Sequence, residues 1–591
     1  MLRRLFLFFF PLALCFAYAA HSTAPQQRVP FTPLHVYYMS PTGSDSNNGT
    51  SPSDAWATPN HPVSCGDVII AEPGSYNSGG MSVTSQPTDC PSTSGGIDST
   101  GGVYFAVVLC NGKLGACYID DDQSNANGAI DVEASNWAFE GWQVSSTGIG
   151  TSGSRGFQAT ACKSDTERIA YIAFINDVVT HANQAYDTND CGMNHNVPGN
   201  GVDYFAVVGS IAQDANSAGI CLAAIDDVGP ANTDTKAGVH VFFDGNFAIA
   251  NQLARPGCGY SDGEAMMFDT WDAHGYVGTG VIKDNILYSS SWANLQVFMQ
   301  KINSSAPYLD VFDNTSYHSN VCVPFSASST GGMNFQLDGG FPWTINVFNN
   351  IDYEDFPNNG CRPHNPVYAM LVGGSNPGPG ATVFNAGGVG LRNIFKGSQT
   401  SCALNRCDSG NNVEENNGFS YGINIYRNPR FANTADLLRD WSGAPTCSSY
   451  TNTSACMGWK YSTQTASPDT VIGDLIPRAP GAKGKGYQPP RVCGDGTSFV
   501  GSISGSKLTV DDVSGVPIGV GQLIQGPGVP ANTIITGGSG PNWTVNNSRT
   551  VHSESMGATY YPYWLKGINY LQVKGTRLYE YNGLTNKPCG M

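Results

Sequence analysis

The chain has 591 residues, of which only 13% are charged, and 71 are glycine. Average domains carry roughly 25% charged residues, and helical enzymes place Glu, Lys and Ala on exposed helix faces, so this composition disfavours a helical protein. The formal net charge of −17 excludes nucleic acid as an expected partner, because phosphate binding needs a basic surface. We therefore expect many short strands joined by turns.

The first twenty residues have the pattern of an export signal. A basic start at residues 3–4 precedes a mostly apolar run at 5–16, and Ala17 and Ala19 supply the small residues of a cleavage site. We expect cleavage after Ala19 and a mature protein that is secreted or lies at the cell surface. The apolar run is too short to span a bilayer, and no transmembrane segment is expected elsewhere.

The cysteine content predicts disulfides. Seventeen cysteines are present, and loss of Cys15 with the signal leaves sixteen, an even number in an exported chain. No CxxC pair occurs, so a structural zinc site is not expected. The sequence leaves the connectivity open. Three close pairs are candidates for local bridges: Cys110/Cys117, Cys402/Cys407 and Cys447/Cys456.

A short unit centred on Asn, or on a substitute for Asn, recurs between residues 175 and 352. The third residues of successive units are 33, 36, 39, 29 and 36 positions apart. The units begin with the triplets Ile175-Asn176-Asp177, Val208-Gly209-Ser210, Asp244-Gly245-Asn246, Lys283-Asp284-Asn285, Phe312-Asp313-Asn314 and Phe348-Asn349-Asn350.

This period is typical of a chain that turns through three short strands and returns above its start. Asn at the same point of successive coils can stack and hydrogen-bond its amide to the next Asn. Stacked coils bury their inner faces only together, so the repeat predicts one continuous rod, a right-handed parallel β-helix. A β-propeller shares this range of periods and stays the alternative, although each unit here shows a single Asn-centred strand.

Three segments resemble the secreted right-handed parallel β-helix proteins of the pectate lyase-like superfamily. Residues 37–58 resemble the opening of such proteins, and residues 65–76 resemble their first strand and turn. Residues 428–431 and 477–486 resemble their closing segment, although Lys485 replaces the usual small residue. The resemblance covers about residues 35–490 and implies the fold and a polysaccharide partner. It does not fix an activity, because the same fold also occurs in adhesins and phage spikes.

The densest acidic segment within the repeats comes just before the unit that contains Lys283. Carboxylates clustered this closely suit Ca²⁺, which takes six to eight oxygen ligands, and the ion would bridge an acidic protein to a uronate carboxylate. The residues predicted to bind calcium are Asp262, Glu264, Asp269 and Asp272.

A calcium site next to a uronate predicts a lyase that acts by β-elimination. Such an enzyme needs a base for the proton next to the carboxylate, and lysine serves when its neutral form is favoured. Lys283 is the positional candidate for this base. His274, Lys301 and Arg255 are the residues expected to bind the substrate. The sequence thus favours a Ca²⁺-dependent lyase of a pectate-type or other uronate polymer.

Two alternatives stay open. A glycoside hydrolase would use paired carboxylates, but the segment 232–234, which resembles a polygalacturonase element, lacks the Gly-His-Gly and Arg-x-Lys that follow it in that family. A non-catalytic adhesin or glycan-binding rod would account for the variable loops and the extra C-terminal region.

Beyond residue 490 the composition of the sequence changes. Residues 496–556 alternate apolar residues between Gly and Pro and predict a small β module. Residues 557–591 form an aromatic-rich tail, and we expect its rings to pack against that module.

Overall fold

The computed structural model describes the chain in segments that cover most of the repeat region and the C-terminal module. Apart from two short 3-10 helices, η1 (Pro52–Asp54) and η3 (Tyr563–Leu565), its regular elements are strands. The described residues are 33–77, 79–91, 102–112, 115–121, 128–145, 155–163, 167–180, 182, 184–189, 201–213, 215, 218–222, 239–249, 264–269, 279–288, 290, 293–299, 308–317, 331–337, 344–348, 350–353, 368–373, 382–384, 394–396, 401–402, 407–408, 413–414, 497–514, 518–519, 522–530, 533–559 and 562–565.

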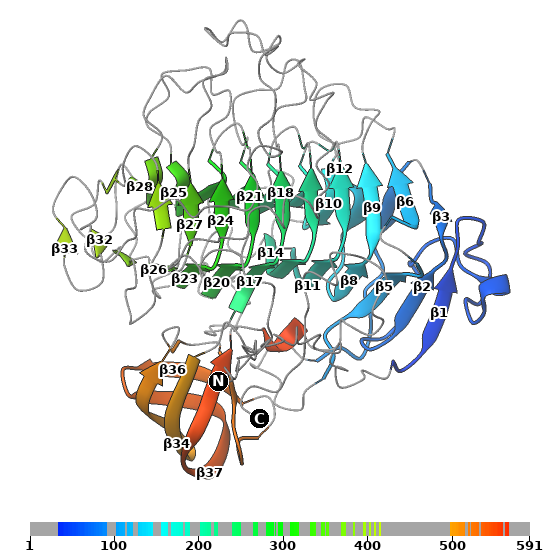
Figure 1. Ribbon diagram of the computed structural model, residues 1–591. Coiled ribbons are helices and arrows are strands. Elements are labelled where there is room, and N and C mark those ends of the chain that lie inside the picture. Colours follow the sequence, from blue (N-terminus) through cyan, green and yellow to red (C-terminus); the bar gives the residue numbers. More distant parts are fainter. Residues whose placement is uncertain are drawn as a thin grey trace, which may run out of the picture.

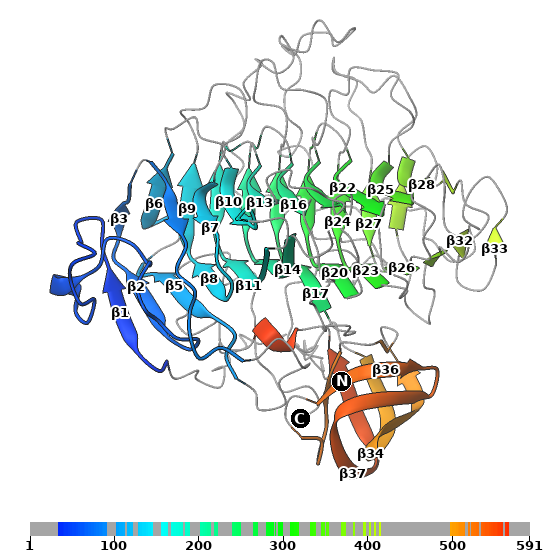
Figure 2. The ribbon, with the colours of Figure 1, turned by 180° about the vertical axis from the view of Figure 1, so that it is seen from behind.

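Most strands form three long parallel sheets, and the chain passes through sheet 1, sheet 2 and sheet 3 in turn before it returns to sheet 1 one level further along. This is a right-handed parallel β-helix, as the sequence predicted, and the strands follow one another along its axis in Figures 1 and 2. Sheet 1 ends in one antiparallel pair, β32 with β33. Its strands are β1 (Val36–Met39), β2 (Val68–Ala71), β5 (Ala106–Cys110), β8 (Trp137–Glu140), β11 (Arg168–Ile175), β14 (Gly201–Val208), β17 (Val239–Asp244), β20 (Thr279–Lys283), β23 (Tyr308–Phe312), β26 (Thr344–Phe348), β29 (Thr382–Phe384), β32 (Cys407–Asp408) and β33 (Val413–Glu414).

Sheets 2 and 3 complete each coil. Sheet 2 contains β3 (Gly74–Ser75), β6 (Cys117–Asp120), β9 (Trp142–Ser145), β12 (Val178–Thr180), β15 (Ile211–Gln213), β18 (Phe247–Ile249), β21 (Ile286–Tyr288), β24 (Thr315–Tyr317), β27 (Ile351–Tyr353) and β30 (Ile394–Lys396). Sheet 3 contains β4 (Met81–Val83), β7 (Gly128–Val132), β10 (Arg155–Thr160), β13 (Tyr186–Asn189), β16 (Ile220–Leu222), β19 (Met266–Asp269), β22 (Leu295–Met299), β25 (Gly331–Leu337), β28 (Tyr368–Gly373) and β31 (Ser401–Cys402).

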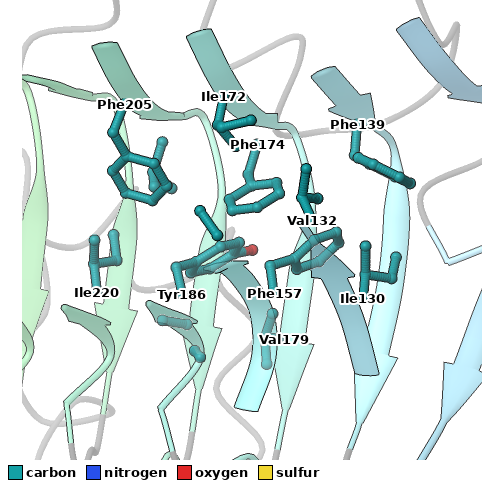
Figure 3. Packing of buried hydrophobic residues seen from close by; sticks show 14 of the residues in the cluster. Ile130, Val132, Phe139, Phe157, Ile172, Phe174, Val179, Tyr186, Phe205 and Ile220 are labelled. Carbon is teal, nitrogen blue, oxygen red and sulfur yellow. The ribbon is translucent and has the colours of Figure 1, made fainter. Parts of the chain in front are cut away.

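The three sheets enclose one elongated apolar core (Figure 3). Successive residues of a strand point to opposite faces, so every second side chain enters this core. In the part shown in Figure 3, the rings of Phe157 and Tyr186 stack with their centroids 5.5 Å apart, and Phe174 packs 4.8 Å from Phe157. Full burial of one such side chain contributes about 1.5–3 kcal/mol, and the repetition of such contacts along the axis stabilises the rod.

The recurring triplets form the two-residue turns between sheet 1 and sheet 2. The first turn residue adopts a positive φ, for example 53° at Asn176 and 67° at Gly245. Gly, Asn and Asp tolerate this left-handed conformation best, which is why they occupy the position. The third residue of each triplet is buried in the wall of the rod.

These third residues form the predicted ladder. The backbone N–H of Asn285 donates to Oδ1 of Asn314 at 3.0 Å, and the N–H of Asn314 donates to Oδ1 of Asn350 at 3.0 Å. The same pattern runs back through Asn246 and Ser210, with distances of 2.9–3.1 Å. The ladder ends at Asp177, whose Oδ1 accepts the N–H of Trp142 at 2.8 Å. The repeat found in the sequence is therefore a continuous hydrogen-bonded column.

A small antiparallel module follows the rod, built from β34 (Thr497–Ser514), β35 (Leu523–Gln525), β36 (Thr533–Ser539) and β37 (Asn542–Thr559). It has a separate core that includes Phe499, Leu508 and Met556. Figures 1 and 2 show it alongside sheet 1. The strands fall at the position where the sequence predicted a β module.

Residues 562–565, which follow the module, pack against the rod rather than against the module. The indole of Trp564 is fully buried on the outer face of sheet 1, and its Nε1 donates to the carbonyl of Val239 at 2.7 Å. Its ring meets those of Tyr171 and Tyr204 edge-on, with centroids 5.9 and 5.8 Å away. For this aromatic residue the expected packing against the module is wrong, because a cluster of buried apolar side chains of sheet 1 accommodates its ring.

Two disulfides link described residues. Cys110–Cys117 confirms one predicted pair, whereas Cys65–Cys90 was not among the predicted close pairs. The side chains of Cys402/Cys407 and Cys447/Cys456 lie outside what the structure describes. No helix in the described part of the chain has the length and apolar character needed to span a bilayer.

Candidate functional site

A column of polar side chains runs across the outer face of sheet 3. On β7, Ile130 and Val132 point into the core, so the residue between them, Asp131, points outward. Gln158 of β10 and Asp187 of β13 occupy the same position on the next two strands, as the strand register shows. The β-helix thus places three chain segments with polar side chains side by side on one face.

Asp131 is a carboxyl group held close to neutrality. It is 1% exposed, and the hydroxyl of Thr160 donates to its Oδ1. The pKa of Asp131 is raised to about 7. Burial is the largest cause and the nearby Glu133 adds to it, whereas the Thr160 hydrogen bond, Arg155 and Lys163 lower the pKa. Its other oxygen, Oδ2, has no hydrogen-bond partner in the described structure. This carboxyl group can therefore carry a proton at neutral pH.

Asp187 has a different environment, because a guanidinium lies against it. Arg155 Nε forms an ion pair with Asp187 Oδ2, and the same nitrogen donates to Gln184 Oε1 at 2.9 Å. The pKa of Asp187 is raised, because burial outweighs the charge of Arg155 and the hydrogen bonds that lower it. Asp187 nevertheless has a direct ion pair with Arg155, which favours its ionised form, whereas Asp131 accepts a hydrogen bond from the neutral hydroxyl of Thr160.

Gln158 lies between these two carboxyl groups. Its side chain is fully buried, and in the described structure neither its Nε2 nor its Oε1 has a hydrogen-bond partner. Leaving a buried polar group unsatisfied costs about 1–3 kcal/mol, so native proteins usually supply a water or a ligand at such a place. The column therefore combines two titratable carboxyl groups with an amide that lacks partners.

The predicted calcium ligands are only partly within the described residues. Asp269 ends β19 and, two residues after the outward Met267, lies on the same outer face of sheet 3 as Asp187. Glu264 comes two residues before this strand and is buried. Among the described residues, no group of three or more His, Cys, Asp or Glu side chains could hold a metal ion. The structure thus associates Glu264 and Asp269 with one strand of sheet 3, and the calcium site stays a prediction.

Lys283, the predicted base, lies at the end of β20 in sheet 1, not in sheet 3. Its Nζ is 3.3 Å from Asp244 Oδ1 and 3.0 Å from Asp284 Oδ2. Two carboxylates at these distances favour the ammonium form, whereas a base must be neutral to accept a proton. The role of Lys283 as the base stays a prediction. The remaining predicted site residues lie outside the described residues: Asp262, Asp272, His274, Lys301 and Arg255.

The Asp131–Gln158–Asp187 column was not predicted from the sequence. These residues are 27 and 29 positions apart, a spacing close to one coil. Each directly follows a residue whose side chain enters the core, namely Ile130, Phe157 or Tyr186. Alignment of the coils by strand alternation could have found them. The predicted calcium site rested on a local concentration of acidic residues, a signal that side chains from separate coils do not produce.

Comparisons with known proteins found distant structural similarities. No family model and no curated protein matches the sequence. Among solved structures, the chain is similar to pectate lyase Pel9A, with 14% identity and a TM-score of 0.35 over 71% of this chain and 87% of that one. A mannuronic acid specific polysaccharide family 6 lyase from human gut microbiota follows, with 10% identity and a TM-score of 0.31 over 64% and 83%.

A third similar structure is the GH136 lacto-N-biosidase from Eubacterium ramulus. It shares 10% identity and a TM-score of 0.30 over 66% of this chain and 67% of that one. Similarities this distant carry no conclusion about the activity of this chain. The right-handed parallel β-helix follows from the topology of its three parallel sheets, and the site has to be judged on its own chemistry.

Proposed function

We propose that the chain processes a polysaccharide along the outer face of sheet 3, with Asp131 and Asp187 as the acid–base pair of a glycoside hydrolase. One observation carries this proposal. Two buried carboxyl groups project from alternate strands of one face, and only one of them is paired with a guanidinium. Pairs of carboxyl groups in unequal surroundings are how enzymes separate an acid from a base.

The spacing of the pair is closer to that of an inverting than of a retaining hydrolase. Neighbouring strands lie about 4.8 Å apart, so the Cα atoms of Asp131 and Asp187, two strands apart, are separated by roughly 9.6 Å. This value is at the upper limit of the about 6.5–9.5 Å between the carboxyl groups of inverting enzymes and well above the about 5–5.5 Å of retaining ones. In this arrangement protonated Asp131 donates a proton to the glycosidic oxygen. Asp187, whose ionised form is favoured by the ion pair with Arg155, activates a water molecule.

The Ca²⁺-dependent lyase predicted from the sequence is the second candidate, because Asp269 lies on this same face and Glu264 precedes the same strand. The donor set of Asp262, Glu264, Asp269 and Asp272 consists of carboxylates, the ligand type that Ca²⁺ prefers. Bound there, the ion would supply positive charge that acidifies the proton next to a uronate carboxylate. Glu264 and Asp269 would then bind the ion at the β19 level, several strands from Asp131.

Product analysis separates hydrolysis, β-elimination and binding without catalysis. The purified protein is incubated with neutral and uronate polysaccharides, with and without a chelator, and reducing ends and ultraviolet absorbance are followed. Hydrolysis releases reducing ends without absorbance, whereas β-elimination produces absorbing unsaturated ends that depend on the cation. Binding without either product identifies an adhesin and overturns the enzyme proposal.

Substitution of the two carboxyl groups tests whether hydrolysis takes place on the outer face of sheet 3. For a hydrolase, Asp131→Asn and Asp187→Asn should each lower kcat/KM about 10²–10⁴-fold, the usual contribution of a general acid or base. Asp177→Asn is the matched control, since it makes the same change at another buried Asp, in the ladder and not on sheet 3. Full activity in both sheet 3 variants would contradict the assignment.

A further inference from the structure

We propose that Gln158 forms a subsite that selects an uncharged sugar unit, recognised through its hydroxyl groups, over a uronate. This inference rests on the proposed function, in which a polysaccharide binds along the outer face of sheet 3. It adds the chemical class of the unit bound at the level of β10.

The carboxamide of Gln158 is the group that recognises the sugar. It is 0% exposed, and neither its nitrogen nor its oxygen has a partner in the described part of the chain. An amide offers two N–H donors and one carbonyl acceptor, and a sugar hydroxyl can both donate and accept. Two neighbouring hydroxyl groups therefore satisfy both ends of this amide. A carboxylate only accepts, and would leave the carbonyl oxygen Oε1 without a donor.

The groups around Gln158 disfavour a second negative charge. Asp131 and Asp187 flank it in register on the two adjacent strands, and Glu133 accepts the hydroxyl of Ser82 at 2.6 Å next to them. Asp131 is held close to neutrality, so the repulsion would come from the carboxylates of Asp187 and Glu133. A uronate carboxylate bound to the Gln158 amide would face them in a water-poor environment, where repulsion between like charges is strong.

The nearby cations are already committed to acidic or carbonyl partners. Arg155 pairs with Asp187. Lys163 donates to the carbonyl oxygen of Glu133 at 2.8 Å, and its Nζ lies 3.8 Å from Glu167 Oε1. Neutralising a uronate would require breaking one of these contacts. A neutral sugar needs no such rearrangement, so the column fits an uncharged unit.

The test uses polymer pairs that differ only at carbon 6 of the sugar. Polygalacturonate is compared with its methyl ester, and polymannuronate with mannan, in binding and turnover measurements at low salt. We expect the uncharged member of the recognised pair to bind at least about 10-fold more tightly. Equal binding, or preference for the uronate, overturns the inference while the proposed function stands. Absence of binding to every polymer overturns both.

The variant Gln158→Met assigns the preference to this residue. It keeps the length of the side chain and removes both polar ends, so binding of the uncharged polymer should fall about 10-fold or more. Thermal stability should rise, because an unsatisfied buried amide is removed. Gln143→Met, on sheet 2, is the matched control and should leave binding unchanged. Loss of stability in Gln158→Met with unchanged binding would show that Gln158 is only a structural residue, and overturns the inference.

Discussion

At the scale of single residues, the chain buries carboxyl groups whose protonation differs from that of exposed acids. Asp131 and Asp177 both lie in strand-bounded positions from which water is largely excluded. Burial disfavours the charged form of each, and only a few hydrogen bonds or cations oppose this effect. We therefore expect Asp131, on the outer face of sheet 3, to make activity depend on pH. We expect Asp177, in the ladder, to make stability depend on pH.

The first prediction concerns the pH dependence of activity. As the general acid, Asp131 works only when protonated, and its pKa is raised to about 7. The hydrolytic kcat/KM should therefore fall as pH rises through about 7, approaching a tenfold loss per pH unit. A pH profile of the wild-type enzyme checks this limb. Activity that increases steadily from pH 6 to pH 9 would contradict the role of Asp131.

The second prediction concerns Asp177, which takes the place of an Asn at the end of the ladder. Burial raises its pKa well above the usual value, although the N–H groups of Trp142 and Ile175 donate to its oxygens. The folded state thus binds a proton more tightly than the unfolded state. This contribution to stability is complete below about pH 4 and is lost as pH rises towards the folded pKa.

Replacement of Asp177 by Asn removes this loss. The stability of the variant relative to the wild type should therefore increase as the pH rises from about 4 to 7. Denaturant unfolding of both proteins at several pH values measures this change. A stability difference that stays constant over this range would show that Asp177 does not bind its proton more tightly in the folded state.

At the scale of elements, the two-residue turn determines how the coils stack. The turn needs a residue that tolerates positive φ, followed by a residue whose side chain can both donate and accept. Both needs restrict the residue type, and so the turn was visible in the sequence as a repeat. The strands themselves were less visible, since almost any apolar alternation satisfies them.

The third prediction tests this ladder. In Asn314→Ala the N–H of Asn285 loses its acceptor, and the carbonyl of Ile282 loses a donor at 2.9 Å. Each unsatisfied buried group costs about 1–3 kcal/mol, so a loss of at least about 2 kcal/mol in unfolding free energy is expected. Asn77→Ala, at an exposed turn, should change it by less than about 0.5 kcal/mol. Similar effects of the two changes would contradict the ladder's contribution.

The site could not be predicted to the same degree. Asp131, Gln158 and Asp187 come together only because three coils with connections of different length end in the same register. Loop length is weakly constrained by stability, so spacing alone does not mark such a column, and only alignment of the coils by strand alternation would reveal it. Asp269 was found because it belongs to a local acidic segment, and its place on the outer face of sheet 3 followed from the fold.

At the scale of the whole molecule, the last described segment connects the antiparallel module to the rod. Trp564 lies over a row of stacked rings on sheet 1. The ring centroids of Tyr171 and Tyr204 are 4.4 Å apart, and those of Tyr204 and His240 are 4.1 Å apart. Beneath them, buried Asp203 accepts from His240 at 2.7 Å. The hydrogen bond from Trp564 Nε1 to the carbonyl of Val239 joins segments 325 residues apart and fixes the module against the rod.

The fourth prediction is that Trp564→Ala releases the module without unfolding the rod. Truncation of a buried Trp costs about 3–5 kcal/mol, enough to shift a local docking equilibrium. Hydrogen exchange should increase at the outer residues of β11, β14 and β17, while the ladder amides stay protected. Val500→Ala, an exposed change in the module, is the control. Protection that is lost along the whole rod would show that the segment is needed for the fold itself.

One structure determination decides where the sugar binds. Crystals of the Asp131→Asn variant are soaked with an oligosaccharide that the wild-type enzyme cleaves or binds. The sugar should lie across β7, β10 and β13 on the outer face of sheet 3, with hydroxyl oxygens within about 3.2 Å of the Gln158 amide. A sugar bound on sheet 1, on sheet 2 or on the antiparallel module would contradict the site described for this protein.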